Sequence, residues 1–265
     1  MADQPARTDT LQSLERGLGV LQVFSKDHAR LTLSDVARLA GITRATARRI
    51  LLTLEQLGHV RSDGRLFSLT PRVLNLGWAY LSSLNLWEIA QPLMEQLVEE
   101  TGESCSAATL DLPDVVYVAR VPTRRIMSIT LSVGTRLPAH CTSMGRVLLA
   151  ALPPDELDRY LAGAELATWT DRTTTDPERL RAALDETRQR GWALVDQELE
   201  IGLRSVAAPI RRGPVTIAAL NVSSAVSRVS LDDLRRRILS PLVRTADTIS
   251  NALTQQGPAH HRTVS

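Results

Sequence analysis

Residues 33–57, LSDVARLAGITRATARRILLTLEQL, constrain the fold of this chain more than any other segment. Apolar residues recur there at helical spacing in two runs, and Gly41 separates the runs at a turn. Thr32 and Thr43 stand where each helix needs an N-cap. Two amphipathic helices joined by a tight turn are typical of a helix-turn-helix, whose second helix enters the major groove of DNA.

The predicted second helix has an apolar stripe and a polar outer face. The same pattern also fits two ordinary packed helices whose arginines simply face water. If the segment binds DNA, the contacts should come from the start and outer face of the second helix. These candidate DNA-binding residues are Thr43, Arg44, Ala45, Arg48 and Arg49.

The next segment favours DNA binding over simple helix packing. Residues 59–69, HVRSDGRLFSL, contain two extended runs around Asp63-Gly64, and Asp-Gly is a strong hairpin signal. A β-hairpin directly after a recognition helix makes a winged helix-turn-helix. Arg61 and Arg65 flank the tip of this predicted wing, and we expect both to reach DNA phosphates.

Composition sets the scale of the molecule and the origin of its charge. The chain has 265 residues, 43% of them hydrophobic, which is enough for two cores. The formal net charge is only +2, so DNA binding must depend on a local basic patch. All cationic residues except Lys26 are arginine, so arginine abundance by itself carries little information.

The chain has two cysteines, Cys105 and Cys141, and their spacing matches neither a disulfide framework nor a zinc site. Two isolated cysteines are typical of proteins in a reducing compartment. The polar start of the chain does not resemble a signal peptide. No apolar run approaches the roughly 20 residues that a membrane helix needs. We therefore expect a cytoplasmic protein that does not associate with membranes.

Helices and strands alternate along the rest of the chain. A further helix is expected over residues 14–24, one from Thr70-Pro71 to Leu81, and one over 87–100 that ends at Gly102. Mixed elements then predict an antiparallel sheet with helices packed on it, an α+β domain. The expected strands are 104–110, 115–121, 126–133, 192–198, 205–210 and 215–222, and the expected helices are 143–152, 154–161, 177–190 and 231–253, the last kinked or restarted at Pro241.

The chain resembles the IclR family of bacterial transcription regulators from Leu11 to about Leu253. The likeness depends on the winged helix-turn-helix and on three later segments, LTPRVLNLGWAYL, AHCTSMGRVLLA and EIGLRSVAAPI. The stretches YVARVPTRRIMSITLSVGTRLPA and SDGRLFSLTPRVLNLG resemble the subgroup that controls aromatic-acid catabolism, namely the protocatechuate, β-ketoadipate and p-hydroxybenzoate regulators.

The resemblance implies a domain plan and a mode of assembly. The residues themselves indicate a flexible tail over 1–10 and a disordered tail over 256–265. Between the tails we expect a winged helix-turn-helix over 11–70, linker helices over 71–90 and, as the resemblance implies, a GAF-like effector-binding domain over 91–255. The resemblance also implies a small-acid effector, dimers formed through the DNA-binding half, and tetramers as pairs of dimers. We expect no metal and no cofactor.

The turn around Ser143 is a candidate site for the effector's carboxylate. A polar turn, Thr142-Ser143-Met144-Gly145, opens an apolar helix here, and free N–H groups at a helix start suit an anion. The alternative is a plain capped helix. In the family this turn touches the carboxylate, so the resemblance gives that role to Ser143, Met144 and Gly145.

Family pocket positions also map onto two predicted strands. Serine and asparagine are unusual on strands with apolar neighbours, and they can pair with a hydroxyl or a carboxylate, although surface-facing alternation would also explain them. Arg120 could hold a carboxylate, and His140 precedes the anion-binding turn. The further candidates are therefore Leu203, Ser205, Asn221, Ser223, Arg120 and His140.

Two rival functional classes remain at this point. An enzyme is disfavoured because the chain lacks G-x-S-x-G, H-E-x-x-H, P-loop and Rossmann motifs, and its five histidines form no metal-binding pattern. A thiol-responsive regulator without a small ligand would use Cys105 and Cys141. The resemblance favours protocatechuate as effector, then p-hydroxybenzoate, then β-ketoadipate, with the acid of another pathway as the alternative.

Overall fold

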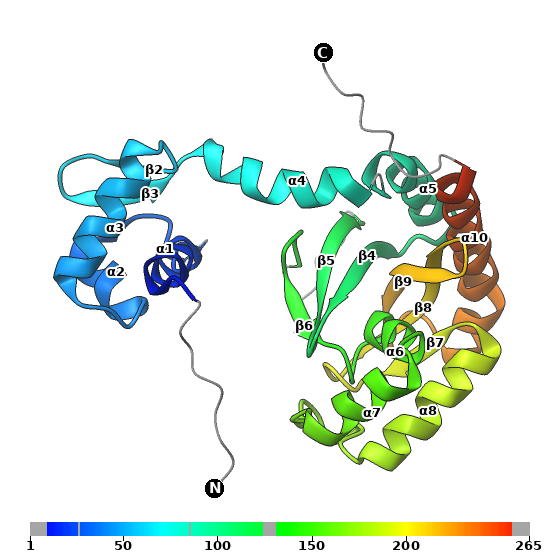
Figure 1. Cartoon of the computed structure of the whole chain (residues 1–265). Helices are drawn as coiled ribbons and strands as arrows, with labels where there is room; N and C mark the ends of the chain where they lie inside the picture. The colour runs from blue at the N-terminus through cyan, green and yellow to red at the C-terminus, as the bar shows by residue number, and fades with distance from the viewer. Residues whose placement is uncertain (1–9, 26, 85, 124–130, 256–265) are drawn as a thin grey trace, which may run out of the picture. The chain divides into compact units, whose positions relative to one another are not determined.

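The computed structural model describes residues 10–25, 27–84, 86–123 and 131–255. The chain divides into two units, Met1–Tyr80 and Leu81–Ser265 (Figure 1). This division lies inside the stretch that the sequence predicts to be a linker, residues 71–90. A 3-10 turn, η1 (Pro71–Val73), begins at the predicted Thr70-Pro71 start, and the helix α4 (Leu74–Leu84) follows it directly.

The first unit has the predicted winged helix-turn-helix fold. Three helices surround a small antiparallel sheet in the strand order β1-β3-β2. Its helices are α1 (Gln12–Gln22), α2 (Leu33–Leu39) and α3 (Arg44–Gln56), and its strands are β1 (Leu31–Thr32), β2 (Val60–Ser62) and β3 (Leu66–Leu69).

Local signals in the sequence account for the helix boundaries of this unit. The Thr32 side chain accepts the N–H of Asp35, whose carboxylate accepts the N–H of Thr32 in return, so the two form a capping box. Thr43 caps α3 by accepting the N–H of Thr46. Gly41, between the helices, has a φ of +63°, which favours glycine.

The second unit is built on one antiparallel sheet of six strands in the order β6-β5-β4-β9-β8-β7. Helices cover both faces of this sheet, as a GAF-like α+β domain requires (Figure 1). The strands are β4 (Ser104–Asp111), β5 (Asp114–Val121), β6 (Arg136–Pro138), β7 (Ala193–Asp196), β8 (Leu203–Arg212) and β9 (Val215–Ala225).

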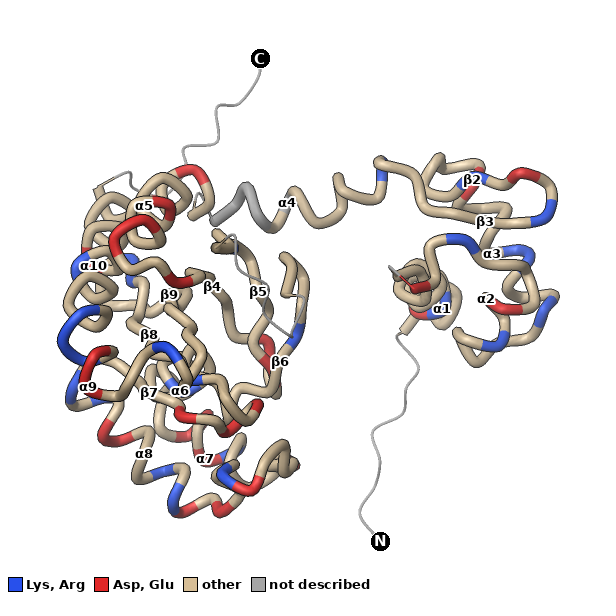
Figure 2. Tube along the Cα trace, turned by 180° about the vertical axis from the view of Figure 1, so that it is seen from behind, with Lys and Arg blue, Asp and Glu red and all other residues tan. Residues whose placement is uncertain are grey.

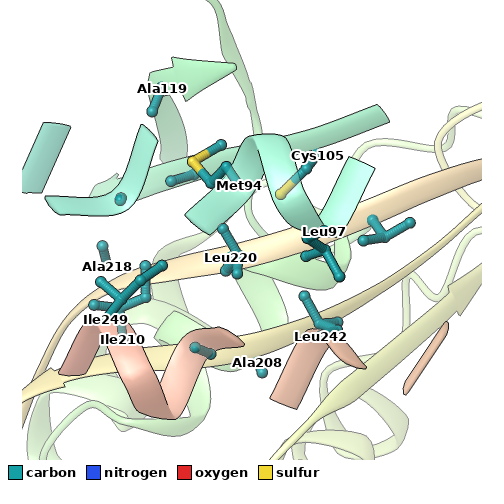
Figure 3. Close-up of a cluster of buried hydrophobic side chains, with 14 of the residues drawn as sticks. Met94, Leu97, Cys105, Ala119, Ala208, Ile210, Ala218, Leu220, Leu242 and Ile249 are labelled. Carbon is teal, nitrogen blue, oxygen red and sulfur yellow. The ribbon is translucent and has the colours of Figure 1, made fainter. Parts of the chain in front are cut away.

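Each face of the sheet has its own hydrophobic core. On one face, α5 (Leu86–Thr101) and α10 (Leu239–Gln255) bury Met94, Leu97 and Leu242 against the strands (Figure 3). On the other, α6 (Ser143–Ala150), α7 (Pro154–Gly163) and α8 (Pro177–Arg190) contribute Leu149 and Leu184 to a second cluster. Because Leu86 and Ala90 are buried in the first of these cores, α5 is part of the second unit.

Two features of this unit differ from the sequence prediction or refine it. The predicted strand 126–133 falls largely outside the described residues, and its last three residues are not in a strand; the pairing with β5 is made instead by β6. The final helix is interrupted just before Pro241, where the sequence predicts a kink or a restart, and α10 begins at Leu239. A short helix, α9 (Leu231–Asp233), and a π-helical turn (Leu234–Ile238) precede α10, because Pro241 has no N–H to donate to the helix.

Across the described residues, the longest apolar helices fall short of what a bilayer crossing requires. The remaining predicted helices and strands are present with boundaries displaced by a few residues. The first helix, for example, begins at Gln12 instead of Leu14. Such displacements are expected because the ends of helices depend on capping contacts as well as on periodicity.

Candidate functional site

The outer face of α3 carries the predicted DNA-binding residues. Helical periodicity buries Ala47, Leu51 and Leu54 in the core of the first unit and directs the opposite face to solvent. Figure 2 shows basic positions along α3 and at the turn between β2 and β3. The exposed predicted residues on and before this helix are Thr43, Arg44, Ala45, Arg48 and Arg49.

The β2–β3 hairpin forms the wing, and its turn is held by one carboxylate. Asp63 Oδ1 accepts the N–H groups of Leu66 at 2.7 Å and Arg65 at 3.0 Å, and Asp63 pairs with Arg30. These backbone hydrogen bonds lower the pKa of Asp63, and the bond from Leu66 has the larger effect. Gly64 completes the turn with a φ of +92°. As a result, Arg65 is exposed at the wing tip.

Side-chain hydrogen bonds fix the wing to the recognition helix. Glu55 on α3 accepts the N–H of Ser62 at 3.1 Å, and Thr70 donates its hydroxyl to Gly58 O at 2.6 Å. Arg61 donates to Ser68 Oγ at 3.2 Å while its side chain stays exposed. The arginines of α3 and of the wing therefore belong to one hydrogen-bonded unit.

In the second unit, the start of α6 is closely packed. Thr142 caps the helix by accepting the N–H of Gly145 at 3.2 Å and donates its hydroxyl to Pro138 O at 3.0 Å. A Cβ on Gly145 would lie 2.1 Å from the carbonyl oxygen of Ala139, so only glycine permits this approach. Ser143 and Met144 are buried beside it.

Two contacts show which way α6 runs across the sheet. Near its C-terminal end, Val147 and Ala150 line an open groove of about 470 Å³ together with Pro209 and Thr216, which lie far along β8 and near the start of β9. From the middle of α6, the long side chain of Arg146 reaches Glu198 in the connection between β7 and β8. The C-terminal end of α6 therefore lies over the far end of β8, and Arg146 extends from the helix toward the end where β8 begins.

The same end of the sheet is unusually polar on the α6 face. Directly opposed residues of an antiparallel pair point to the same face. Arg120 opposes Ser106, which opposes Asn221, which opposes Ala207 of the core beneath α6. The neighbouring row on this face contains Ser104, Ser223 and Ser205.

On the α6 face of this end, two oxygens have no hydrogen-bond partner among the described residues. Asn221 Oδ1 and Ser143 Oγ are both buried and unpaired, whereas Asn221 Nδ2 donates to Ser223 Oγ at 3.1 Å. An unsatisfied buried polar atom is costly, so it requires an explanation, and a bound ligand is one. The sheet register thus brings Asn221, Ser223, Ser205 and Arg120 together on one face.

The other predicted effector residues differ in their surroundings. Met144 is fully buried in the core beneath α6, while Leu203 is half-buried at the first position of β8. His140 Nε2 lies 3.0 Å from the carbonyl oxygen of Ala167. Burial lowers the pKa of His140, which favours the neutral imidazole. Arg124 and Arg125, which follow Arg120 in the sequence, lie outside the described residues.

Sequence reasoning missed the role of Arg146. This side chain is buried, donates from Nε to His140 O at 3.1 Å and from Nη2 to Glu198 Oε2 at 2.7 Å. Glu198 Oε2 also accepts the N–H of Thr174 at 2.9 Å. The signal available in the sequence was a single arginine within the apolar helix SMGRVLLA, which must find a partner if it is buried.

The described residues contain no group of histidine, cysteine and acidic side chains that would hold a metal ion. Cys105 and Cys141 are both buried free thiols; burial raises the pKa of Cys105 and that of Cys141, the latter to about 12. A thiol that remains protonated and buried is a poor redox sensor.

Comparison with known families matches both parts of the chain. Residues 13–64 match the IclR helix-turn-helix domain, and residues 78–251 match the family described as the C-terminal domain of the bacterial transcriptional regulator IclR. The second match covers more than half of the chain, and the two matches together span both units.

Individual relatives agree with the family matches. The chain is 46% identical to the Pca regulon regulatory protein of Pseudomonas putida, over 92% of this chain and 85% of that protein. It is 37% identical to the p-hydroxybenzoate hydroxylase transcriptional activator of Acinetobacter baylyi, over 92% of each. The crystal structure of an IclR homologue from Microbacterium hydrocarbonoxydans complexed with 4-hydroxybenzoate superposes with a TM-score of 0.83 at 27% identity, over 92% of this chain and all of that one.

Proposed function

The chain belongs to the IclR family of bacterial transcription regulators, and on that premise we propose that it controls genes of aromatic-acid breakdown in response to a small-acid effector. The observation that carries the effector part is a pair of buried oxygens, Ser143 Oγ and Asn221 Oδ1, that have no hydrogen-bond partner in the described parts of the chain. The printed names of two relatives refer to the Pca regulon and to p-hydroxybenzoate hydroxylase, which supports this class of pathway.

The first unit binds double-stranded DNA through α3 and the wing. The exposed arginines of α3 would read base edges in the major groove, and Arg61 and Arg65 on the wing would contact phosphate. A single winged helix contacts too few base pairs for genomic specificity, so the operator should be an inverted repeat bound by a dimer.

Exposed apolar residues on α4 support assembly through the DNA-binding half. Leu74 is 73% exposed, and Trp78 is 60% exposed. Such side chains on one helix favour burial against a second copy. The predicted seam consists of Val73, Leu74, Gly77 and Leu81, although the side chain of Leu81 lies outside those described. Two such dimers would pair into a tetramer.

The second unit binds the effector between the start of α6 and the polar rows of the sheet. Ser143, Met144 and Gly145 would form one wall, and the opposite wall would be Leu203, Ser205, Asn221 and Ser223, with Arg120 and the free ring nitrogen of His140 at the edges. Ring hydroxyls suit the serine and asparagine groups. Protocatechuate is the first candidate, followed by p-hydroxybenzoate and β-ketoadipate.

Effector binding regulates DNA binding only if the ligand prefers one arrangement of the protein to another. The protein needs no cofactor for this role, and we propose that it has no catalytic activity and works in the cytoplasm beside its operator. A thiol-responsive mechanism is the weaker alternative because both cysteines are buried.

Calorimetry on the full chain tests the proposed function. We expect saturable binding of protocatechuate, p-hydroxybenzoate or β-ketoadipate, and a change in operator affinity when the bound acid is present. Binding of a short aliphatic keto acid, with none of these three bound, would instead assign the protein to another small-acid pathway. Operator binding that responds only to an oxidant would favour the thiol alternative.

A further inference from the structure

The end of the recognition helix α3 is hydrogen-bonded to the turn that leads into α4. Arg72 Nη1 donates to Leu57 O at 3.2 Å, and the hydroxyl of Thr70 donates to Gly58 O at 2.6 Å. The N–H of Thr70 donates to His59 O at 2.9 Å. Two residues at the start of η1 therefore bind the three successive carbonyl groups that follow α3. We call this set of contacts the α3–η1 junction.

The residues of the junction suit one another chemically. A guanidinium at the C-terminus of a helix binds the carbonyl groups there and complements their partial negative charge. Thr70 Oγ also accepts the N–H of Arg72 at 3.3 Å, so one hydroxyl holds both sides of the turn. Gly58 has a φ of +79°, and a Cβ there would lie 2.8 Å from Arg72 Nη1. Glycine at this position leaves the space in which the guanidinium lies.

Apolar packing does little to fix the direction in which α4 leaves the first unit. None of the residues of η1 is buried, and from 71 to 80 every described side chain except that of Val73 is exposed. Leu76, which lines a groove between α1 and α3, is still 53% exposed. A helix without buried side chains is free to change direction at the turn before it, so the hydrogen bonds of the junction set that direction.

The direction of α4 matters because this helix carries the proposed seam of the dimer. When two copies are joined along α4, the angle between α3 and α4 determines how far apart the two recognition helices lie. The half-sites of an inverted repeat are about one helical turn of DNA apart, or a multiple of it. A change in that angle would therefore move one α3 out of its major groove.

We infer that Thr70 and Arg72 determine which spacing of operator half-sites the dimer accepts, without contacting a base edge themselves. They are positioning residues, because they act by holding α3 at a fixed angle to α4. The inference rests on the proposed function, since it requires a dimer joined along α4 on an inverted repeat. The alternative role for Arg72 is a phosphate contact, which the uncharged Thr70 cannot share.

The test measures fluorescence anisotropy of the full chain with three duplexes. The duplexes are an operator selected from random sequences, the same operator with two base pairs inserted between its half-sites, and a single half-site. The junction variants are Arg72→Met, Thr70→Val and the conservative Thr70→Ser. Thr53→Val is one control, because the Thr53 hydroxyl donates to Arg49 O within α3. Arg159→Met, which removes an exposed arginine from the second unit, is the other.

The natural chain should bind the selected operator at least about tenfold more tightly than the operator with the insertion. Arg72→Met and Thr70→Val should each reduce this preference by about fivefold, the typical contribution of one hydrogen bond. The reduction should come from weaker binding to the selected operator, while affinity for the single half-site stays unchanged. Thr70→Ser and both controls should behave like the natural chain.

Four outcomes would overturn the inference and leave the proposed function intact. The first is an unchanged spacing preference in both Arg72→Met and Thr70→Val. The second is a natural chain that tolerates the insertion. The third is loss of half-site binding in both variants, which would mean that the junction supports α3 itself.

The fourth outcome would make Arg72 a phosphate contact. Arg72→Met would then weaken binding to all three duplexes and lower the salt dependence by about one unit, whereas Thr70→Val would have no effect. A natural chain that binds none of the duplexes would instead refute the proposed function, and the inference with it.

Discussion

Arg146 of α6 and Glu198 of the β7–β8 connection form a buried ion pair, with Nη2 2.7 Å from Oε2 and side chains only 8% and 10% exposed. The pair ties the start of α6 to the chain that leads into β8. Thr170 and Thr173 add hydrogen bonds to the carbonyl oxygens of residues 197 and 198. Both walls of the proposed effector site are therefore connected through this contact.

Breaking the pair from one side should be strongly destabilising. Arg146→Met leaves Glu198 buried without its cation, which typically costs about 3–5 kcal/mol. The double variant Arg146→Met/Glu198→Leu should recover much of that loss, since no unpaired charge remains. Urea unfolding followed by circular dichroism measures both. Arg159→Met is the control, because the Arg159–Asp155 pair is exposed and should contribute less than about 1 kcal/mol. Equal effects of Arg146→Met and Arg159→Met would contradict this account.

Gly145→Ala should damage the start of α6. The new Cβ would lie 2.1 Å from Ala139 O, so the helix or the preceding turn must move, at a cost of about 1–3 kcal/mol. Gly163→Ala at the end of α7 is the matched control, because nothing lies within 4 Å of a Cβ added at that position. Thermal unfolding and effector calorimetry should both separate the two variants. A Gly145→Ala protein with unchanged stability would show that the close approach is not required.

Arg48 and Arg49 should carry operator affinity. Replacing either with alanine should cost on the order of 1–3 kcal/mol if it reads a base edge. A lost phosphate contact would instead make the slope of log binding constant against log salt concentration less steep by about one unit. Fluorescence anisotropy on an operator selected from random duplexes measures both quantities. Arg159→Ala/Arg181→Ala removes the same charge from the second unit and should leave binding unchanged. Unaltered operator affinity of Arg48→Ala/Arg49→Ala would remove α3 from the interface.

The two cysteines should be unreactive in the folded protein. Their raised pKa values mean that the thiolate fraction at any given pH is smaller than that of a free cysteine, and both side chains are buried. Cys105 lies in the core between α5 and the sheet (Figure 3). Alkylation at pH 8, read by mass spectrometry, should label both only after unfolding. Rapid labelling of the native protein, with loss of operator binding, would revive the thiol-responsive alternative.

Short-range signals in the sequence were sufficient for most of the fold. The caps at Thr32 and Thr43, the turn at Asp63-Gly64 and the break at Pro241 act within a few residues of themselves, and each appears in the structure. Strand β6 was missed because it has only three residues, too few to display an alternating pattern.

The sequence by itself determined the winged helix-turn-helix, the α+β class of the second unit and the family, because these depend on local periodicity, capping and contiguous motifs. Only the tertiary structure decided which polar side chains share a site. Arg146 and Glu198 form an ion pair although they are 52 positions apart in the sequence, and Arg120 donates a hydrogen bond to Ser106, which is 14 positions away. Such partners are chosen by strand register and by the direction of α6 across the sheet, and no periodicity along the chain records either one.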